Sequence, residues 1–317
     1  MMLKLEQIKV AYETIQRDIH HTPIMTSKKL SEACENQMFL KAEHLQKTGS
    51  FKIRGAMNKV KQAVKEGATL VTAASSGNHG QAVAFIASQL HIPATIVVPE
   101  DANRSKVAAI KAYGGHVEKC GFTSEERIPR AKAIAEEKAG VFIPPYDDPL
   151  IMAGQGTIGL EILEQVTDAD LVVVPVGGGG LLSGILTAIK ETKPSVKVIG
   201  VEPELAKDTY LSLQNGKITS IGQTKTIADG LRTSQPGELT FPIVQKYIDD
   251  LVLVSEDEIR QAMLFVMERM KQLIEPSSAV TIAAAMFGHL QVTAQNIVTV
   301  ISGGNVDVSQ LHDMMYS

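Results

Sequence analysis

Short runs of aliphatic and β-branched residues alternate with longer stretches of helical periodicity through most of the 317-residue chain. Such alternation is typical of β–α–β units, in which each helix carries the chain back to the same edge of a parallel sheet. Between residues 69 and 143 this compact series can form a small sheet of its own. The pattern there predicts strands at 69–74, 94–98, 116–120 and 141–143, and helices at 78–90, 103–113 and 125–139.

Longer units follow the turn at residues 144–149. A stretch without charge at 171–189 is long enough to resemble a membrane span, but Pro175 and four glycines within it disfavour a continuous helix. We interpret it as strand, loop and helix. Together the units predict a doubly wound α/β protein with two lobes, whose ligands bind at the carboxyl ends of the strands. The predicted helices are 151–166, 181–191, 255–274 and 277–289, and the predicted strands are 171–176, 196–202 and 296–301.

Composition excludes several classes of partner. The chain has 31 Lys and Arg against 35 Asp and Glu, a formal net charge of −4, and aromatic residues make up only 4 %. Nucleic-acid surfaces need a basic face or aromatic stacking platforms, so we expect no nucleic-acid partner, and no polybasic patch suggests a membrane. Two cysteines, Cys34 and Cys120, provide no disulfide framework and favour a reducing cytoplasm.

Four consecutive glycines, Gly177–Gly180, stand between a fully apolar predicted strand and a helix. Their backbone N–H groups and the positive helix end could hold a phosphate without a basic side chain, although a tight turn is the simpler alternative. A dinucleotide fingerprint needs a third glycine where Leu182 or Ser183 stands, while Glu202 does lie at a suitable distance. The case for a nicotinamide site is therefore weaker, but this alternative stays open.

Three further segments combine glycine with polar side chains. In Lys47–Gly55, Ser50 is a candidate N-cap that places Lys52 in the first helical turn, where the helix end disfavours a cation. A lysine with a lowered pKa suits Schiff-base chemistry, whereas most lysines are solvated surface side chains. Ser75–Gly80 could receive a carboxylate or simply cap a helix, and Ser302–Asn305 could be a turn.

Five motifs, KTGSFKIRGA, SSGNHGQA, GQGTIGLE, VGGGGL and SGGN, occur in this order over nearly the whole chain. Together they resemble the serine/threonine dehydratase and serine racemase family of pyridoxal-phosphate (PLP) enzymes, which have the tryptophan-synthase-β-like fold, or fold type II. The resemblance implies two lobes with the cofactor in the cleft between them. Residues 1–68 and 148–317 would form the large PLP-binding lobe, and residues 69–147 a small mobile lobe.

The resemblance also implies roles for individual residues. Lys52 would form the Schiff base with the cofactor and remove the Cα proton of the substrate. Ser302 would bond the pyridine nitrogen and, being uncharged, should leave it largely unprotonated. The implied cofactor contacts are Phe51, Lys52, Asn78, Gly177, Gly178, Gly179, Gly180, Leu181 and Ser302. The implied substrate contacts are Ser75, Ser76, Asn78, His79 and Arg127.

Two features resemble serine racemases in particular. Racemisation needs a proton donor on the face opposite Lys52, and Ser76 stands where serine racemases carry a serine. The segment Glu202–Asp208 resembles their divalent-cation site, with Glu202, the Ala206 carbonyl and Asp208 as ligands. Oxygen ligands suit Mg²⁺ or Ca²⁺, although two solvated surface carboxylates are the alternative.

The expected enzyme is a PLP-dependent ammonia-lyase that dehydrates L-serine and L-threonine to the 2-oxo acid and ammonia, with serine racemisation as a second activity. The alternatives are a threo-3-hydroxyaspartate dehydratase of the same family and, in a different class, a nicotinamide-dependent oxidoreductase. The expected assembly is a cytoplasmic homodimer that acts on small amino acids.

Overall fold

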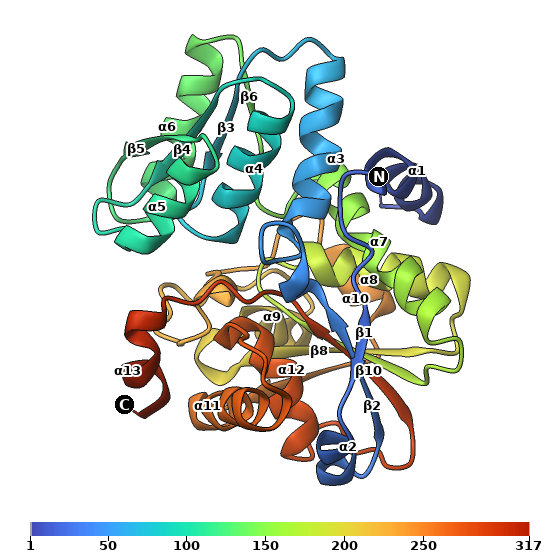
Figure 1. The fold of residues 1–317 in the computed structure, drawn as a ribbon. Coiled ribbons are helices and arrows are strands. Elements are labelled where there is room, and N and C mark those ends of the chain that lie inside the picture. Colours follow the sequence, from blue (N-terminus) through green and yellow to red (C-terminus); the bar gives the residue numbers. More distant parts are fainter. Residues whose placement is uncertain (1, 317) are drawn as a thin grey trace.

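A computed structural model describes residues 2–316 of the chain. It contains two separate β-sheets, one in each lobe, and the lobe with the smaller sheet lies above the larger one in Figure 1. The six strands of the larger sheet have the order β1-β2-β10-β7-β8-β9, and the four strands of the smaller sheet have the order β5-β4-β3-β6. All neighbouring strands pair in parallel except β1, which is antiparallel to β2.

The strands and helices alternate along the chain as β–α–β units require. The strands are β1 Ile24–Thr26, β2 Gln37–Ala42, β3 Val71–Ala74, β4 Ala94–Val98, β5 His116–Lys119, β6 Val141–Phe142, β7 Leu171–Pro175, β8 Lys197–Pro203, β9 Asp250–Val254 and β10 Asn296–Ile301. The α-helices are α1 Leu5–Ile15, α2 Lys28–Cys34, α3 Lys52–Lys65, α4 Asn78–Gln89, α5 Arg104–Ala112, α6 Ser124–Glu137, α7 Pro149–Gln165, α8 Gly180–Thr192, α9 Asp208–Asn215, α10 Phe241–Tyr247, α11 Glu256–Phe265, α12 Pro276–Met286 and α13 Leu311–Tyr316. Shorter helices are η1 Glu43–Leu45, η2 Glu204–Ala206, η3 Asp229–Leu231, η4 Val266–Met270 and η5 Val308–Gln310.

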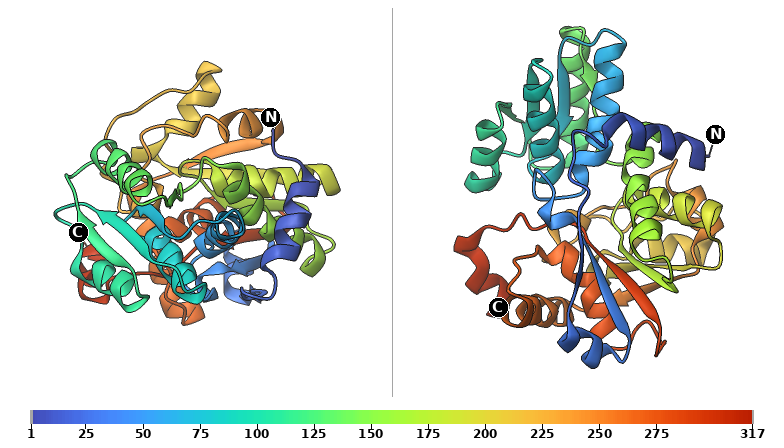
Figure 2. Two further views of the ribbon diagram at one scale, coloured as in Figure 1. Left: turned by 90° about the horizontal axis from the view of Figure 1, so that it is seen from above. Right: turned by 45° about the vertical axis from the view of Figure 1, so that its right-hand side comes forward.

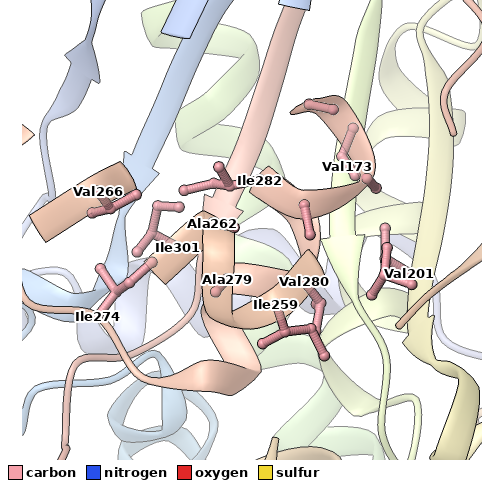
Figure 3. Close-up of a cluster of buried hydrophobic side chains, with 14 of the residues drawn as sticks. Val173, Val201, Ile259, Ala262, Val266, Ile274, Ala279, Val280, Ile282 and Ile301 are labelled. Atoms are coloured by element: carbon pink, nitrogen blue, oxygen red, sulfur yellow. The ribbon is translucent and has the colours of Figure 1, made fainter. Parts of the chain in front are cut away.

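The larger sheet is buried on both faces, which explains why its strands are apolar without alternation. On one face, Val173 and Val201 pack against residues of α11 and α12 such as Ile259 and Val280, as Figure 3 shows. On the opposite face, the next strand residues, Val172 among them, pack against α7 and α8. The two helical layers and the sheet between them form the larger lobe.

The smaller sheet has its own core, in which β3 and β4 pack against α4 and α5. Helix α3 also belongs to this core, because Ile53, Ala56 and Val60 are fully buried within it. Figure 2 shows α3 running alongside the smaller lobe in the right-hand view. The sequence analysis placed residues 52–65 in the larger lobe, whereas the side chains of α3 pack in the core of the smaller lobe.

Most predicted elements lie within a few residues of their observed positions. Residues 171–189 form strand β7, the glycine loop and most of helix α8, as predicted. None of the helices within residues 2–316 is long and apolar enough to cross a membrane. The prediction of one helix over 255–274 is wrong at its end. Helix α11 widens into the π-helix η4, and Lys271 stops it with a left-handed φ of 60°. The chain then turns so that the backbone N–H of Glu275 reaches the Gly303 carbonyl at 3.1 Å.

Candidate active site

Lys52 is the first residue of α3, in the first helical turn as predicted. The proposed N-cap is wrong, however: Phe51 precedes the helix in helical conformation, and the buried Ser50 hydroxyl has no hydrogen-bond partner within residues 2–316. Ser50 instead pairs its backbone with Gly303 in an isolated β-bridge. That pairing explains the misplaced cap, because a long-range strand contact uses the residue that local rules assign to the helix.

The Lys52 amine is held in an enclosed environment. It donates a hydrogen bond to the Pro145 carbonyl at 2.9 Å and lies 5.1 Å from the centre of the Phe51 ring. Burial lowers the pKa of the Lys52 amine to about 8, against the opposing attraction of Glu275. A free amine is a nucleophile and a base, so this lysine is prepared for Schiff-base chemistry near neutral pH.

The glycine run Gly177–Gly180 joins β7 to the N-terminus of α8, as predicted. The N–H groups of Gly177, Gly178 and Gly179 donate no hydrogen bond to any residue that the structure describes. A Cβ on Gly178 would lie 2.5 Å from the Tyr146 ring, so only glycine lets the two segments approach. Free N–H groups at a helix N-terminus form a site for a phosphate.

Asn78, the first residue of α4, connects the two lobes. Its Nδ2 donates to both carboxylate oxygens of Glu275, at 2.9 and 3.0 Å, and its Oδ1 accepts from Asn305 Nδ2 at 2.8 Å. Burial raises the pKa of the Glu275 carboxyl to about 7, and Asp229 adds to this effect. The side-chain amide of Asn78 is thus fixed in orientation by two partners from the larger lobe.

Ser302 follows the last strand, β10, and lies next to the lysine segment. Its carbonyl accepts from the Phe51 N–H at 2.9 Å, and its hydroxyl lies 3.0 Å from the Ser278 hydroxyl. The contacts Phe51–Ser302 and Asn78–Asn305 bring three of the predicted motifs together, although more than 200 residues separate Asn78 from Ser302.

The loop Ser75–Gly80 lies between β3 and α4, and its members have different environments. The Ser75 hydroxyl accepts from the Gly77 N–H at 3.3 Å, and Ser76 is partly exposed. His79 is buried, its Nε2 donates to the Ile143 carbonyl at 2.9 Å, and burial together with Lys52 lowers the pKa of its ring to about 3. The neutral imidazole therefore anchors the start of α4 to the segment that follows β6.

The structure does not bring Arg127 to the Lys52 segment. Its guanidinium donates to the Phe122 carbonyl at 3.0 Å and to the Ser124 hydroxyl at 3.2 Å, both at the start of its own helix α6. Both contacts are local and hold Arg127 against the N-terminal end of α6.

Glu202 and Asp208 form a second polar cluster, between β8 and α9. Both side chains are fully buried, so the alternative of solvated surface carboxylates is wrong. Glu202 accepts from the N–H groups of Thr209 and Tyr210 at 3.0 and 2.8 Å, and the Asp208 carboxylate accepts from the Thr233 hydroxyl at 3.3 and 3.4 Å. Burial raises the pKa of Glu202 to about 8 and that of Asp208 to about 7.

No lysine or arginine within residues 2–316 forms an ion pair with Glu202 or Asp208. The described residues contain no cluster of three acidic, histidine or cysteine side chains that could hold a metal by themselves. The buried Ala206 lies between the two carboxyls in sequence, in η2. Two adjacent carboxyls and a backbone carbonyl are a donor set that fits a hard cation, since each oxygen otherwise lacks a positive partner.

Sequence reasoning missed Glu275, Pro145 and Tyr146. Glu275 could have been suspected, because a carboxylate placed between the apolar pair Leu273–Ile274 and the helix start PSSAV is drawn away from the water that it prefers. Pro145 and Tyr146 contact Lys52 and the glycine run only through folding of the chain, and no local signal marks them.

The fold and these contacts define an α/β enzyme that can hold a phosphate-bearing aldehyde on a lysine between two lobes. Comparison with known proteins agrees: residues 15–303 match the family described as pyridoxal-phosphate dependent enzyme. The chain belongs to this family, within the group of threonine dehydratases and serine racemases that the motifs resembled.

Relatives of both kinds align over almost the whole chain. The catabolic L-threonine dehydratase of Escherichia coli K12 is 44% identical, covering 97% of this chain and 94% of its own. The serine racemase of Homo sapiens is 44% identical, covering 97% and 92%. The solved structure of maize serine racemase superposes with a TM-score of 0.95 at 38% identity, covering 100% of this chain and 98% of its own. The two-lobed fold type II is thereby confirmed.

Proposed function

We propose that this enzyme dehydrates L-serine and L-threonine to the 2-oxo acid and ammonia, and that it also racemises serine. The observation that carries the proposal is the Lys52 amine, whose pKa is lowered by burial and which lies beside Phe51, Ser302 and the Asn78–Glu275 pair. Relatives with either activity in their names are equally similar to this chain. The nicotinamide alternative loses its support with the family assignment.

The residues present fit pyridoxal phosphate. The Lys52 amine would attach its aldehyde carbon, the free N–H groups of Gly177–Gly180 and Leu181 would hold its phosphate, and Phe51 would pack beside its ring. Asn78 would face the ring hydroxyl and Ser302 the ring nitrogen. When bound, the cofactor withdraws electrons from the Cα of the substrate and so acidifies its Cα–H bond.

Side chains and backbone groups of the protein then have to bind the substrate carboxylate and move protons at its Cα atom. The carboxylate would be received by Ser75, Asn78 and the backbone N–H groups at the start of α4, including that of His79, where the helix end favours an anion. Lys52 would remove the Cα proton on one face, and the hydroxyl of Ser76 would supply a proton on the other face. Arg127 would take part only after a movement of the smaller lobe, because its present contacts are local.

Product analysis with L-serine, L-threonine and threo-3-hydroxyaspartate tests this proposal. We expect pyruvate and D-serine from L-serine, and 2-oxobutanoate from L-threonine. Lys52→Ala should abolish all products, whereas Ser76→Ala should lose D-serine and retain pyruvate. Turnover in Lys52→Ala, or no product from serine and threonine in the native enzyme, would refute the proposal. Activity confined to hydroxyaspartate would support the alternative substrate.

We further propose that Glu202, the Ala206 carbonyl and Asp208 bind Mg²⁺ or Ca²⁺. The support is the burial of two carboxyls without a basic partner, each with a raised pKa. A bound cation would compensate both charges and fix the β8–α9 connection.

The pH dependence of stability tests the cation site. In the unfolded chain these carboxyls ionise near their ordinary pKa values of 4.5 and 3.8, whereas in the folded protein they ionise near 8 and 7. The folded state therefore binds more protons between these limits, and the metal-free protein should lose stability as the pH rises from about 5 to 8. Thermal unfolding should show this loss removed by Mg²⁺ or Ca²⁺ and reduced in Asp208→Asn. Equal curves with and without either cation would contradict the site.

A homodimer in the cytoplasm and a mobile smaller lobe remain predictions. Light scattering of the purified enzyme tests the dimer, for which we expect twice the chain mass of 34.1 kDa.

A further inference from the structure

Thr240 lies beside the glycine run that joins β7 to α8. It directly precedes α10, and its side chain is fully buried. Its hydroxyl oxygen is 2.8 Å from the Gly178 carbonyl and 3.2 Å from the Gly237 carbonyl, so its single proton goes to the nearer Gly178 oxygen. The Gly237 N–H also donates to the Gly178 carbonyl, at 3.2 Å. Two donors from one loop therefore hold the oxygen of the peptide that joins Gly178 to the next residue.

Asp147 in turn fixes the loop that contains Thr240. Its carboxylate accepts from the N–H groups of Glu238, Leu239 and Thr240 at 3.1, 2.9 and 3.3 Å. These N–H groups stand just before α10, where a helix leaves its donors without partners of its own. A Cβ on Gly237 would overlap the Asp147 carboxylate, so the loop can approach it this closely only with glycine. The carboxylate thereby determines where the Thr240 hydroxyl lies.

The glycine run needs an external support because the backbone of glycine rotates easily. Gly178 and Gly179 have no Cβ, and Gly179 already adopts a left-handed φ of 87°. The peptide between them can therefore flip at little cost. A trans peptide directs its C=O and its N–H to opposite sides. In one orientation the Gly179 N–H is available to an anion, whereas in the flipped orientation the Gly178 oxygen would repel that anion.

We propose that Thr240 is a positioning residue that holds the Gly178 carbonyl away from the cofactor phosphate and so keeps the Gly179 N–H directed at the phosphate. A Cβ on Gly179 would lie 2.7 Å from Thr240 Oγ1, so the hydroxyl lies directly against this peptide. The Gly179 N–H donates to no residue that the structure describes and is left for the phosphate. Asp147 acts through Thr240. The inference rests on the proposed function only for the contact between the glycine run and the phosphate.

A comparison of two cofactor forms separates this role from a general structural one. Pyridoxal phosphate and 5-deoxypyridoxal carry the same ring and aldehyde, but the second has no phosphate. Absorbance titration of the cofactor-free enzyme measures both dissociation constants without substrate. In Thr240→Val we expect the dissociation constant of pyridoxal phosphate to rise about tenfold, the effect of one hydrogen bond. The dissociation constant of 5-deoxypyridoxal should stay unchanged.

Two variants serve as controls. Thr240→Ser keeps the hydroxyl and should retain the native affinity for pyridoxal phosphate. Thr187→Val removes an equally buried hydroxyl of α8, which donates to the Ser183 carbonyl at 2.9 Å. This hydroxyl does not contact the glycine run, so both dissociation constants should stay at their native values.

Asp147→Ala tests the inference a second time even if the valine variant folds poorly, because Asp147 is only partly buried. It releases the loop that contains Thr240, so affinity for pyridoxal phosphate should again fall while affinity for 5-deoxypyridoxal stays the same. Loss of a negative charge alone would instead strengthen the binding of an anionic phosphate.

Two results in a folded variant of Thr240 or Asp147 would overturn the inference. One is an unchanged or lower dissociation constant for pyridoxal phosphate, and the other is an equal rise for both cofactor forms. Because no substrate is present, these results are independent of the product analysis, and absence of turnover on serine would refute the proposed function alone.

Discussion

The Lys52 amine contacts the Pro145 carbonyl and the Phe51 ring, and its pKa is about 8 instead of 10.5. At pH 7 about 1 molecule in 10 then carries the free amine, compared with about 1 in 3,000 for an ordinary lysine. The desolvation that lowers this pKa is the single-residue effect on which the reactivity of the site depends.

This pKa predicts how the cofactor-free enzyme captures pyridoxal phosphate. The rate of covalent attachment should rise with pH and reach half its maximum near pH 8, because only the unprotonated amine attacks an aldehyde. Stopped-flow absorbance of the bound cofactor measures the rate. Glu275→Gln removes the charge that opposes the shift and should move the midpoint lower. A midpoint near 10 in the native protein would contradict the burial argument.

The sequence predicted Lys52, Asn78 and Ser302 as site residues through the motifs that carry the family resemblance, and the structure brings these three segments together. Sequence reasoning missed Glu275 and Tyr146, whose roles depend on contacts with Asn78 and with Gly178 across large sequence separations. Local patterns contain no information about such pairs.

At the scale of elements, the start of α3 is fixed by its neighbours. Arg54, fully buried, donates to Glu43 and Glu161 at distances of 2.6 to 2.8 Å, which ties α3 to the end of β2 and to α7. Helices α3 and α7 also approach closely at Gly154, where an added Cβ would lie 2.6 Å from the Arg54 carbonyl and from the Gly55 Cα.

Gly154→Ala should therefore separate α7 from α3. We expect a loss of about 1–3 kcal/mol in the free energy of unfolding, typical of overpacking, and weaker cofactor binding because Lys52 begins α3. Urea unfolding and a cofactor titration measure the two effects. Glu164→Ala, on the exposed face of the same helix, is the control and should change neither. Native stability in Gly154→Ala would show that the helices can move apart without cost.

Element positions were largely predictable for strands such as Ala94–Val98 and Asn296–Ile301, where apolar runs end at turn residues. Strand β1 and helix α2 were not predicted, since they have only three and seven residues. The widened turn η4 was also missed, because the apolar periodicity continues through it while the backbone changes.

At the scale of the whole molecule, α5 of the smaller lobe is connected to two segments of the larger lobe. Asn103, which caps α5, donates to Asp307 at 2.8 Å, and Lys106 pairs with Asp229. Asp229 begins η3, whose Leu231 packs against Gly177 of the proposed phosphate loop. These contacts can couple the position of the smaller lobe to the cofactor site.

Breaking this connection should loosen the smaller lobe. In Asp307→Ala we expect amide hydrogen exchange in α5 to become several-fold faster, while exchange in β7 and β10 stays unchanged, and KM for serine to rise. Asp257→Ala, which removes an exposed ion pair within α11, is the control and should affect neither. Unchanged exchange in α5 would show that Asp307 does not hold the lobe.

The predicted two-lobed fold follows from the alternation of elements, but the assignment of α3 to the core of the smaller lobe does not. Ile53 and Val60 could have faced either lobe, and only the packing decides between them.

The central claim is that the chemistry of this enzyme takes place at Lys52. Reduction of the cofactor-loaded enzyme with borohydride, followed by peptide mass spectrometry, tests it most directly, because reduction makes the lysine–cofactor bond permanent. We predict that the cofactor mass is found on the peptide containing Lys52, and that Lys52→Ala shows none. Attachment to another lysine, with Lys52 unmodified, would contradict the account.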